Sequence, residues 1–531
     1  MSQTKTQGKE KSIANEIIDL IIGDCELVHN QVKDAFAIVV QEGTRHVYSI
    51  RSRSFCDWIA SKYYASKKSA LSDATLKTVI STLSGKAVFG GRLVTVHTRI
   101  AKTDDGYWLD LCNDDWEAVL INAEGWKVLS GNAIPLFCRS NSMQAIPSPT
   151  VGGSLDDLWK IINIPTSDRL VVLTWLLECL REDTPHVVFE LVGEQGSAKS
   201  TTQKFLKMLI DPNFANLRAA PKKVEDVWIG ALNSHLVSLE NISNLGNDYQ
   251  DALCVLATGG AHATRMLYSN SEEVILNLRK PIILNGISVN ITAQDLLDRS
   301  IHIELPTVED RLQSSHVDQI FESQYASIVG ALLDQFVAAL RLIDKVQIAQ
   351  ADKPRMLDFA ILGEAVSMAN GLPEGTFIDY YKSMRRKGVY RTIDSSPIGS
   401  ALLGFLQSHT SGWSGQLNGL LAALNSHKPY GEHNWPKSAK ALGDVLRRLS
   451  PAIRTLGFEC KPKPRQAGTI IWEITPLSSK LPNQCPASPA SLENIPQLDQ
   501  VAGHPRHSGH EIQSFVEVAD FKKNCLVLVD D

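Results

Sequence analysis

Residues 186–210 read HVVFELVGEQGSAKSTTQKFLKMLI, and this stretch decides the fold of the 531-residue chain. It begins with an apolar run typical of a buried strand, continues with small residues and ends with a helical composition. In a strand, tight turn and helix of this kind, backbone N–H groups point inward at the positive end of the helix dipole. The stretch therefore predicts a phosphate-binding loop in a parallel α/β sheet.

The predicted loop follows the pattern GxxxxGK[ST] with one departure, at the second glycine. Lys199 is expected to set its charge against the β- and γ-phosphates of ATP, and the Ser200 hydroxyl to ligate Mg²⁺. Glycine usually precedes the lysine, but this chain has Ala198, which is tolerable if its φ angle is negative. The alternative is an ordinary glycine- and serine-rich turn. The predicted nucleotide contacts are Gly193, Gly196, Ser197, Ala198, Lys199, Ser200 and Thr201.

Composition is that of a soluble globular protein, with 44% hydrophobic and 21% charged residues and a net charge of −5. The weak acidity argues against a protein that coats nucleic acid, so any DNA contact needs a local basic patch. The nine cysteines form no CxxC pair, which signals neither a zinc site nor a disulfide framework. The polar start and the short apolar run 170–180 predict no signal peptide and no membrane span. We expect a cytoplasmic protein.

Patterns along the chain predict three domains and a lid. Residues 1–150 mix strand-like runs such as AFAIVV with helical ones such as DATLKTVISTL, which predicts an α+β domain of unknown role. Residues 151–308 alternate helix and strand and are expected to form the P-loop core. Residues 309–392 are expected to be a helical lid, and residues 393–478 a small domain of short helices that ends in a strand.

Two segments have the composition of irregular chain. MQAIPSPTVGGS, residues 143–154, predicts a linker between the first two domains. Residues 479–531, rich in Pro, Ser, Gln and His, predict a flexible tail. The apolar end of the tail, CLVLVDD, could dock on a partner or on the chain's own domains.

A phosphate loop needs a second strand that carries an acid, and HLVSLEN, residues 235–241, fits this need. Glu240 ends the predicted strand and is expected to hold Mg²⁺ or its water. Asn241 occupies the usual position of the catalytic base, where an amide can orient a water molecule but cannot take its proton. Slow catalysis, or a double role for Glu240, would follow. The alternative is an ordinary acid at the end of a strand.

Further along the chain, three polar residues occupy informative positions. Asn285 ends the predicted strand KPIILN, where an amide could sense the γ-phosphate, although a turn-forming Asn before glycine is the alternative. Arg299, in DLLDRSIHIELP, could reach the γ-phosphate held by a neighbouring subunit, whereas the alternative is an ion pair with Asp295 or Asp298. Arg265 flanks a predicted hairpin and could contact DNA.

The order of these features resembles the AAA+ ATPases, specifically the hexameric superfamily 3 type helicases of phages and mobile elements. More closely, it resembles the ATP-binding, primase–helicase-like replication proteins of prophages and integrated elements. The resemblance covers residues 155–476. It implies an AAA+ core with a parallel sheet and a helical lid, ATP hydrolysis, and a homo-oligomer for which a hexameric ring is favoured. Single-stranded or forked DNA would be the partner.

The resemblance also implies roles for individual residues. Lys199 and Ser200 match Walker A, Glu240 matches Walker B, Asn285 matches sensor 1 and Arg299 sits where arginine fingers sit. Arg355 is a weak candidate for a second sensor. Two departures stand against a motor: Asn241 replaces the usual catalytic Glu, and the hairpin has the acidic pair 272–273 near its tip, where helicases usually have Lys or His.

The stretch 434–474 predicts a winged helix that grips DNA. It contains an amphipathic helix, a strand, a basic loop and a second strand, and residues 433–465 hold eight Lys or Arg residues against the two acids Asp444 and Glu459. The alternative is a solvated basic face of a structural domain. The predicted DNA contacts are Lys437, Lys440, Arg447, Arg448, Lys461, Lys463 and Arg465.

Two functions remain open at this point. In the first, the chain is an AAA+ ATPase that hydrolyses ATP to move or melt DNA during replication of a mobile element. In the second, it is a DNA-binding ATPase switched by nucleotide, with little unwinding, in regulation or phage defence. Arg299 and the ordered motifs favour the first function, whereas Asn241 and the acidic hairpin tip favour the second.

Overall fold

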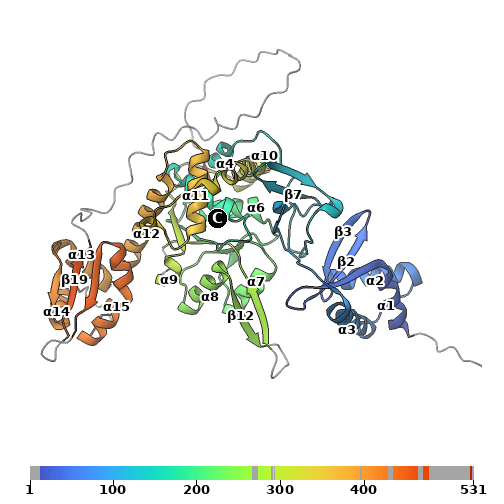
Figure 1. Ribbon diagram of the computed structural model, residues 1–531, viewed down its shortest axis with the longest axis horizontal. Coiled ribbons are helices and arrows are strands. Elements are labelled where there is room, and N and C mark those ends of the chain that lie inside the picture. Colours follow the sequence, from blue (N-terminus) through green and yellow to red (C-terminus); the bar gives the residue numbers. More distant parts are fainter. Residues whose placement is uncertain are drawn as a thin grey trace, which may run out of the picture.

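The structure is a computed structural model that describes residues 12–265, 273–288, 291, 293–394, 397–428, 435–464, 470–477 and 527–528. Figure 1 shows a central α/β body between two smaller parts. The blue amino-terminal unit lies on one side of the central body, and the orange and red carboxy-terminal domain lies on the other, beyond helix α12.

The amino-terminal unit packs three helices against a small sheet of order β3-β2-β1-β4. Serine side chains cap each of the three helices by accepting a backbone N–H from the first turn, as Ser52 does from Phe55. The elements are α1 Ile13–Asp24, β1 Cys25–His29, β2 Ala35–Gln41, β3 Thr44–Ser49, α2 Arg53–Lys67, α3 Asp73–Gly90 and β4 Arg92–Leu93.

A second four-stranded sheet, of order β5-β6-β7-β8, belongs to the central body by its packing. Its strands are β5 Ile100–Thr103, β6 Gly106–Asp110, β7 Ala118–Asn122 and β8 Gly125–Leu129. Leu109 and Val119 lie in the same hydrophobic cluster as the central helices. The single domain predicted for residues 1–150 is therefore two units. Between β4 and β5 the side chain of Arg99 turns into the interior.

The segment 143–154 was expected to be a linker, but it is a packed strap. The backbone N–H of Ile146 bonds to Leu111 O at 2.8 Å, and that of Thr150 bonds to Ala326 O at 3.1 Å. A Cβ atom on Gly330 would lie 1.8 Å from Thr150 O, so the strap needs glycine there to approach helix α10. Close backbone approach of this kind leaves no freedom between the second sheet and the core.

The core is a five-stranded sheet of order β10-β11-β14-β9-β15, and all its neighbouring strands are parallel. This confirms the predicted parallel sheet. The strands are β9 Val188–Val192, β10 Arg218–Ala219, β11 Val237–Glu240, β14 Ile282–Gly286 and β15 Ser300–Glu304. An antiparallel hairpin, β12 Gly260–Arg265 with β13 Glu273–Leu278, projects from the body (Figure 1).

Helices cover both faces of the sheet, which is why β9 is buried along its whole length. Phe189 and Leu191 face one hydrophobic cluster, whereas Val188 faces the other. Helices α5, α6, α10 and α11 share the first cluster, and α7, α8 and the end of α12 share the second. The helices are α4 Leu155–Ile161, α5 Arg169–Glu178, α6 Lys199–Ile210, α7 Val224–Leu232, α8 Asn247–Thr258, α9 Gln294–Leu297, α10 Ser314–Leu340, α11 Leu357–Ala369 and α12 Thr376–Asp394.

One helical segment, Ser314–Lys345, is long and apolar enough to cross a membrane by length and composition. It contains α10, whose Phe321, Leu333 and Phe336 are buried in the first cluster. Core helices of soluble proteins pass the same test, and this burial accounts for the apolar character of the segment.

The carboxy-terminal domain has three helices and an antiparallel sheet of order β17-β19-β18. The elements are α13 Pro397–Ser408, β17 Trp413–Gly415, α14 Leu417–Asn425, α15 Ala439–Thr455, β18 Phe458–Pro462 and β19 Trp472–Pro476. Of the predicted tail, the structure describes β20 Val527–Leu528, which pairs in parallel with β16 Arg311–Leu312 of the central body.

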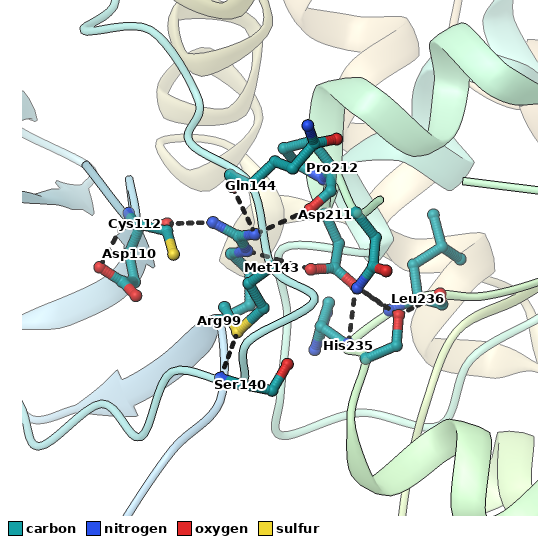
Figure 2. Close-up of polar contacts among 12 residues, drawn as sticks. Arg99, Asp110, Cys112, Ser140, Met143, Gln144, Asp211, Pro212, His235 and Leu236 are labelled. Carbon is teal, nitrogen blue, oxygen red and sulfur yellow. Dashed lines mark hydrogen bonds and ion pairs between the residues drawn. The ribbon is translucent and has the colours of Figure 1, made fainter. Parts of the chain in front are cut away.

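A buried ionic network ties the amino-terminal strands to the core (Figure 2). The carboxylate of Asp211, just past α6, accepts hydrogen bonds from Arg99 at 3.1 Å, from Lys207 at 2.6 Å and from the backbone N–H groups of His235 and Leu236. Burial alone would raise the pKa of Asp211, but the charges of Lys207 and Arg99 hold it well below its usual value. Its contribution to stability is therefore present above the ordinary pKa and is lost only in stronger acid.

Replacing Arg99 by methionine should lower the free energy of unfolding by about 3–5 kcal/mol, because Asp211 would keep its burial and lose a paired charge. Chemical denaturation measures this loss. Arg92→Met is the matched control, since Arg92 forms an exposed pair with Glu26 and should cost less than about 1 kcal/mol. Equal small losses at the two positions would contradict the structural role given to Arg99.

Candidate functional site

Polar residues of three neighbouring strands meet at the carboxyl edge of the parallel sheet. Strand β9 runs into the predicted phosphate loop, β14 lies beside it and ends near Asn285, and β11 lies beyond β14 and ends at Glu240. Parallel register aligns these ends, since Leu239 is level with Leu284 and Asn285 with Leu191. The fold thus brings together the loop, the acid and the amide that the sequence predicted as separate motifs.

The side chain of Lys199 folds back over the loop that precedes it. Its Nζ atom donates to Gly193 O at 2.9 Å, Glu194 O at 2.8 Å and Ser197 Oγ at 3.3 Å, and the side chain is almost entirely buried. Three oxygen acceptors around one ammonium group show that the loop is curled around the position of a cation. An incoming phosphate group could replace these oxygens as the partner of the ammonium.

The loop contains backbone conformations that favour glycine at two positions. Gly196 has φ +82° and Ala198 has φ +55°. The tolerance of Ala198 was predicted on the condition of a negative φ, and that condition is wrong. The αL conformation is strained for alanine, and helix α6 begins immediately after it, so Ala198 holds the turn that aims the first N–H groups of α6.

Asn163 connects the phosphate loop to the segments around it. Its Nδ2 atom donates to Ser197 O at 3.0 Å and to Pro306 O at 2.7 Å, and its backbone N–H bonds to Thr202 Oγ1 at 3.2 Å. The loop is therefore fixed to the chain after β15 and to the first turns of α6.

Glu240 and Asn285 lie at the predicted edge, but their surroundings differ. Glu240 is partly exposed and forms no ion pair with the residues that the structure describes. Asn285 is fully buried: its Oδ1 accepts from the backbone N–H of Asn241, and its Nδ2 donates to Gln203 Oε1 at 2.7 Å. Gln203 in turn donates to Ser238 Oγ and Leu239 O. This amide relay links α6 to the turn after β11.

The relay gives Asn241 and Asn285 a shared geometric role. Asn241 adopts φ +53°, a left-handed conformation that asparagine tolerates, and its N–H is held by Asn285 at 2.9 Å. The conformation of the Glu240–Asn241 turn thus depends on Asn285. The alternative, in which Asn285 only forms a turn before Gly286, therefore does not hold, because its side chain fixes the Glu240–Asn241 turn.

The site suits a magnesium nucleotide by its donor set. Ser200 is the second residue of α6, and Glu240 ends a strand two positions away from β9 in the same sheet, so both offer hard oxygen ligands at one edge. The Lys199 ammonium and the N-terminal N–H groups of α6 provide the positive charge that a triphosphate needs.

A cavity of about 600 Å³ adjoins the phosphate loop. Glu194 of the loop forms part of its wall, and helix α12 contributes two cations, Lys387 and Arg391. Arg391 is ion-paired with Glu304. Burial raises the pKa of Asp168, which also lines the cavity, although its hydrogen bond from Tyr380 of α12 opposes the rise.

Three basic residues near the loop were missed by the sequence analysis. Lys387 and Arg391 lie in a long amphipathic helix, where cations ordinarily mark a solvated face, so no local signal distinguishes them. Arg311 follows an acidic turn, yet its guanidinium lies against Gly196, where an added Cβ atom would be 2.2 Å from its Nη2 atom. Their proximity to the loop comes from tertiary packing.

Arg299 lies at the opposite edge of the sheet from the phosphate loop of its own chain. The N–H of Val188, the first residue of β9, bonds to Arg299 O, so the length of β9, about 16 Å, separates that level from the loop. Arg299 pairs with Asp295 and donates to Cys254 Sγ at 3.1 Å. Arg355 pairs with the same Asp295 at 2.7 Å, so the structure does not bring it to its own loop as a second sensor.

The predicted DNA contacts lie in two regions. Arg265 ends β12 and Arg465 belongs to the basic loop; the side chain of the first and the whole of the second lie outside the described residues. The exposed predicted residues are Lys440, Arg447 and Arg448 on α15, Lys437 just before this helix, and Lys461 on β18. Lys463 pairs with Glu473 at 2.8 Å, and Arg447 pairs with Asp444 at 2.7 Å. Their contact with DNA stays a prediction.

Comparison with protein families matches two consecutive segments of the chain. Residues 155–385 match the family described as "Actinomycete integrative conjugative element replication protein", and residues 398–489 match the family described as "AICE RepA C-terminal domain". The first match contains the phosphate loop, the acid strand and most of the lid, up to residue 385 in α12, and the second contains the basic helix α15. A comparison with functionally curated proteins gave no match.

Two solved structures are similar to the chain at low identity. "SCCmec type IV Cch - active helicase" is 12% identical with a TM-score of 0.41, covering 85% of this chain and 92% of its own. "The A form apo structure of NrS-1 C terminal region-CTR" is 11% identical with a TM-score of 0.37, covering 86% of this chain and 98% of its own.

Replacing Ala198 by glycine should raise the free energy of unfolding by about 1 kcal/mol, since glycine adopts the left-handed conformation without strain. ATP affinity should be unchanged or higher, and chemical denaturation together with nucleotide titration measures both. Ala422→Gly in helix α14 is the control and should instead lower stability by about 1 kcal/mol. A loss of stability at position 198 would show that the alanine is unstrained.

Proposed function

Since residues 155–385 and 398–489 match the family models of actinomycete integrative conjugative element replication proteins, we propose that this protein is an AAA+ ATPase that acts on DNA as the helicase-like motor of element replication. The observation that carries this proposal is the Lys199 ammonium, which is held on three oxygen atoms inside a strand–loop–helix. The acid Glu240 ends a strand of the same sheet. These groups supply the charge and the ligands that phosphoryl transfer requires.

In the proposed reaction the protein binds and orients the triphosphate of ATP. The N–H groups of the loop and the Lys199 ammonium bind the β- and γ-phosphates. The ammonium thereby releases the loop oxygens that it now contacts. Ser200 and Glu240 would hold Mg²⁺, which neutralises the charge that develops on the transferred group. Asn285 acts through the Glu240–Asn241 turn, which it holds at a fixed distance from α6.

Water activation is the weak step of this machinery. Asn241 can orient a water molecule but cannot accept its proton, so Glu240 would have to serve both the metal ion and the water. We therefore expect slow ATP turnover. This observation favours the second candidate function, a DNA-binding ATPase that nucleotide switches and that unwinds little.

Arg299 supports assembly as the route to full activity. In its own chain it is separated from the phosphate loop by the sheet, whereas a neighbouring subunit in a ring could receive it beside the γ-phosphate. We propose a homo-oligomer, with a hexameric ring favoured, in which Arg299 releases its pairing with Asp295 to act on the neighbour's nucleotide.

DNA binding is proposed for the outer side of α15 and the strand that follows it. Ser438 caps α15, and the apolar side of the helix packs on Trp472 and the small core of its domain, which leaves the basic side outward. Arg447 and Arg448 lie next to each other on this exposed side. Their charges suit a DNA backbone, in a chain that is acidic as a whole.

Replacing Lys199 by alanine should weaken ATP binding at least tenfold and abolish DNA-stimulated phosphate release, because the buried ammonium is the main counter-charge of the loop. Titration with a fluorescent ATP analogue and a phosphate-release assay measure the two effects. Lys204→Ala is the control on the same helix, since Lys204 pairs with Asp318 and should leave both unchanged.

The same assays decide between the two candidate functions when strand displacement on forked DNA is added. Displacement that requires ATP and Lys199 supports the motor. ATP-dependent DNA binding without displacement supports the switch. No binding of ATP with magnesium by the unaltered protein would overturn both.

Replacing Arg447 and Arg448 together by alanine should flatten the salt dependence of DNA affinity by up to about 2 units of slope. DNA affinity measured at a series of salt concentrations gives the slope. The matched control replaces Lys62 and Lys67 of α2, which form exposed ion pairs, by alanine. This variant should leave the slope unchanged. An unaltered slope in the arginine variant would remove both arginines from the DNA contact surface.

A further inference from the structure

The cavity beside the phosphate loop has the size and walls of a nucleoside site. Its volume of about 600 Å³ falls within the range of small-molecule pockets, about 300–1,000 Å³. Pro165, Pro306 and Met384 provide apolar surfaces for a flat ring, and Glu194 connects the cavity to the loop. A nucleotide whose phosphates lie on the loop therefore has room here for its base.

One wall residue has a hydrogen-bonding atom with no partner. The His302 side chain is 4% exposed, and its Nδ1 atom lies 2.6 Å from Glu190 Oε2 on the adjacent strand. Its Nε2 atom is buried and, within the part of the chain that the structure describes, has no hydrogen-bond partner. Such an atom costs free energy until a ligand pairs with it.

The partner of Nδ1 determines what Nε2 can do. A carboxylate accepts hydrogen bonds, so an ionised Glu190 pairs with the tautomer of His302 that carries its proton on Nδ1. In the neutral imidazole Nε2 is then an acceptor, and it matches a donor such as an exocyclic amino group.

Helix α12 controls access to this acceptor. Gly388 lies over the imidazole, where an added Cβ atom would be 3.0 Å from His302 Cδ2 and 3.6 Å from Nε2. Nε2 is covered in this conformation, so a ligand can reach it only if α12 shifts, and glycine at position 388 places no side chain in the way. Lys387 and Arg391, one residue before Gly388 and three residues after it, line the same cavity.

We propose that this cavity binds the base of the nucleotide, and that His302 Nε2 selects adenine by accepting a hydrogen bond from its 6-amino group. The inference rests on the proposed ATP-binding function and adds the residue that chooses the base. A guanine or hypoxanthine ring presents a 6-oxo group, which would set an acceptor against an acceptor.

The test compares ATP with purine riboside triphosphate, which has hydrogen in place of the 6-amino group, by titration of the full chain. The unaltered protein should bind ATP about threefold to tenfold more tightly, as expected for one hydrogen bond. His302→Asn keeps a donor for Glu190 and removes Nε2, so it should bind the two nucleotides equally. His302→Gln retains an amide near the position of Nε2 and should restore part of the preference.

Controls separate this inference from the proposed function. His427→Ala, at an exposed histidine of the carboxy-terminal domain, should keep the full preference for ATP. Equal affinity of the unaltered protein for both nucleotides, or an unchanged preference in the Asn variant, would overturn the role of His302 and leave ATP binding intact. Failure of the unaltered protein to bind either nucleotide would overturn the ATPase itself.

Discussion

The buried carboxylate of Asp211 is the interaction on which the arrangement of the chain depends. It sits between the end of α6 and the start of β11, where it accepts from Lys207 of the helix and from the N–H groups of His235 and Leu236 before the strand. It also accepts from Arg99, so the amino-terminal strands are bound to the same point. The helix that starts at the phosphate loop and the strand that ends at Glu240 are thereby fixed at the edge opposite the nucleotide site.

At the other edge a second polar link completes the frame. Gln203, one turn into α6, bonds to Asn285, and Asn285 holds the backbone of Asn241. The loop helix and the acid strand are thus connected at both ends, by an ionic network and by an amide relay. Neither connection contacts the proposed ligand directly. Both fix the spacing between Lys199 and Glu240, which is the property that phosphate chemistry requires.

The parts of the site that follow from local sequence were predictable. The strand, turn and helix around Lys199 are contiguous, and Glu240 and Asn285 end recognisable buried strands. Features that depend on distant contacts were not predictable. The positive φ of Ala198 follows from how α6 joins the loop, the strap over 143–154 is ordered by close approach to Gly330, and Arg99 is buried by its pairing with the distant Asp211. The cavity-lining residues of α12 likewise depend on where this helix packs.

Helix α12 has a position with mechanical consequences. Val389 and Ile393 of this helix share a hydrophobic cluster with Ala452 of α15, so the carboxy-terminal domain packs directly on the helix that carries Lys387 and Gly388. The last turns of α12 thus have two neighbours: Lys387, Gly388 and Arg391 line the proposed nucleotide cavity, and Val389 and Ile393 pack towards the domain proposed to bind DNA. A displacement of that domain would therefore move one wall of the cavity. Mechanical force on the bound DNA would in this way set the rate at which the hydrolysed nucleotide dissociates.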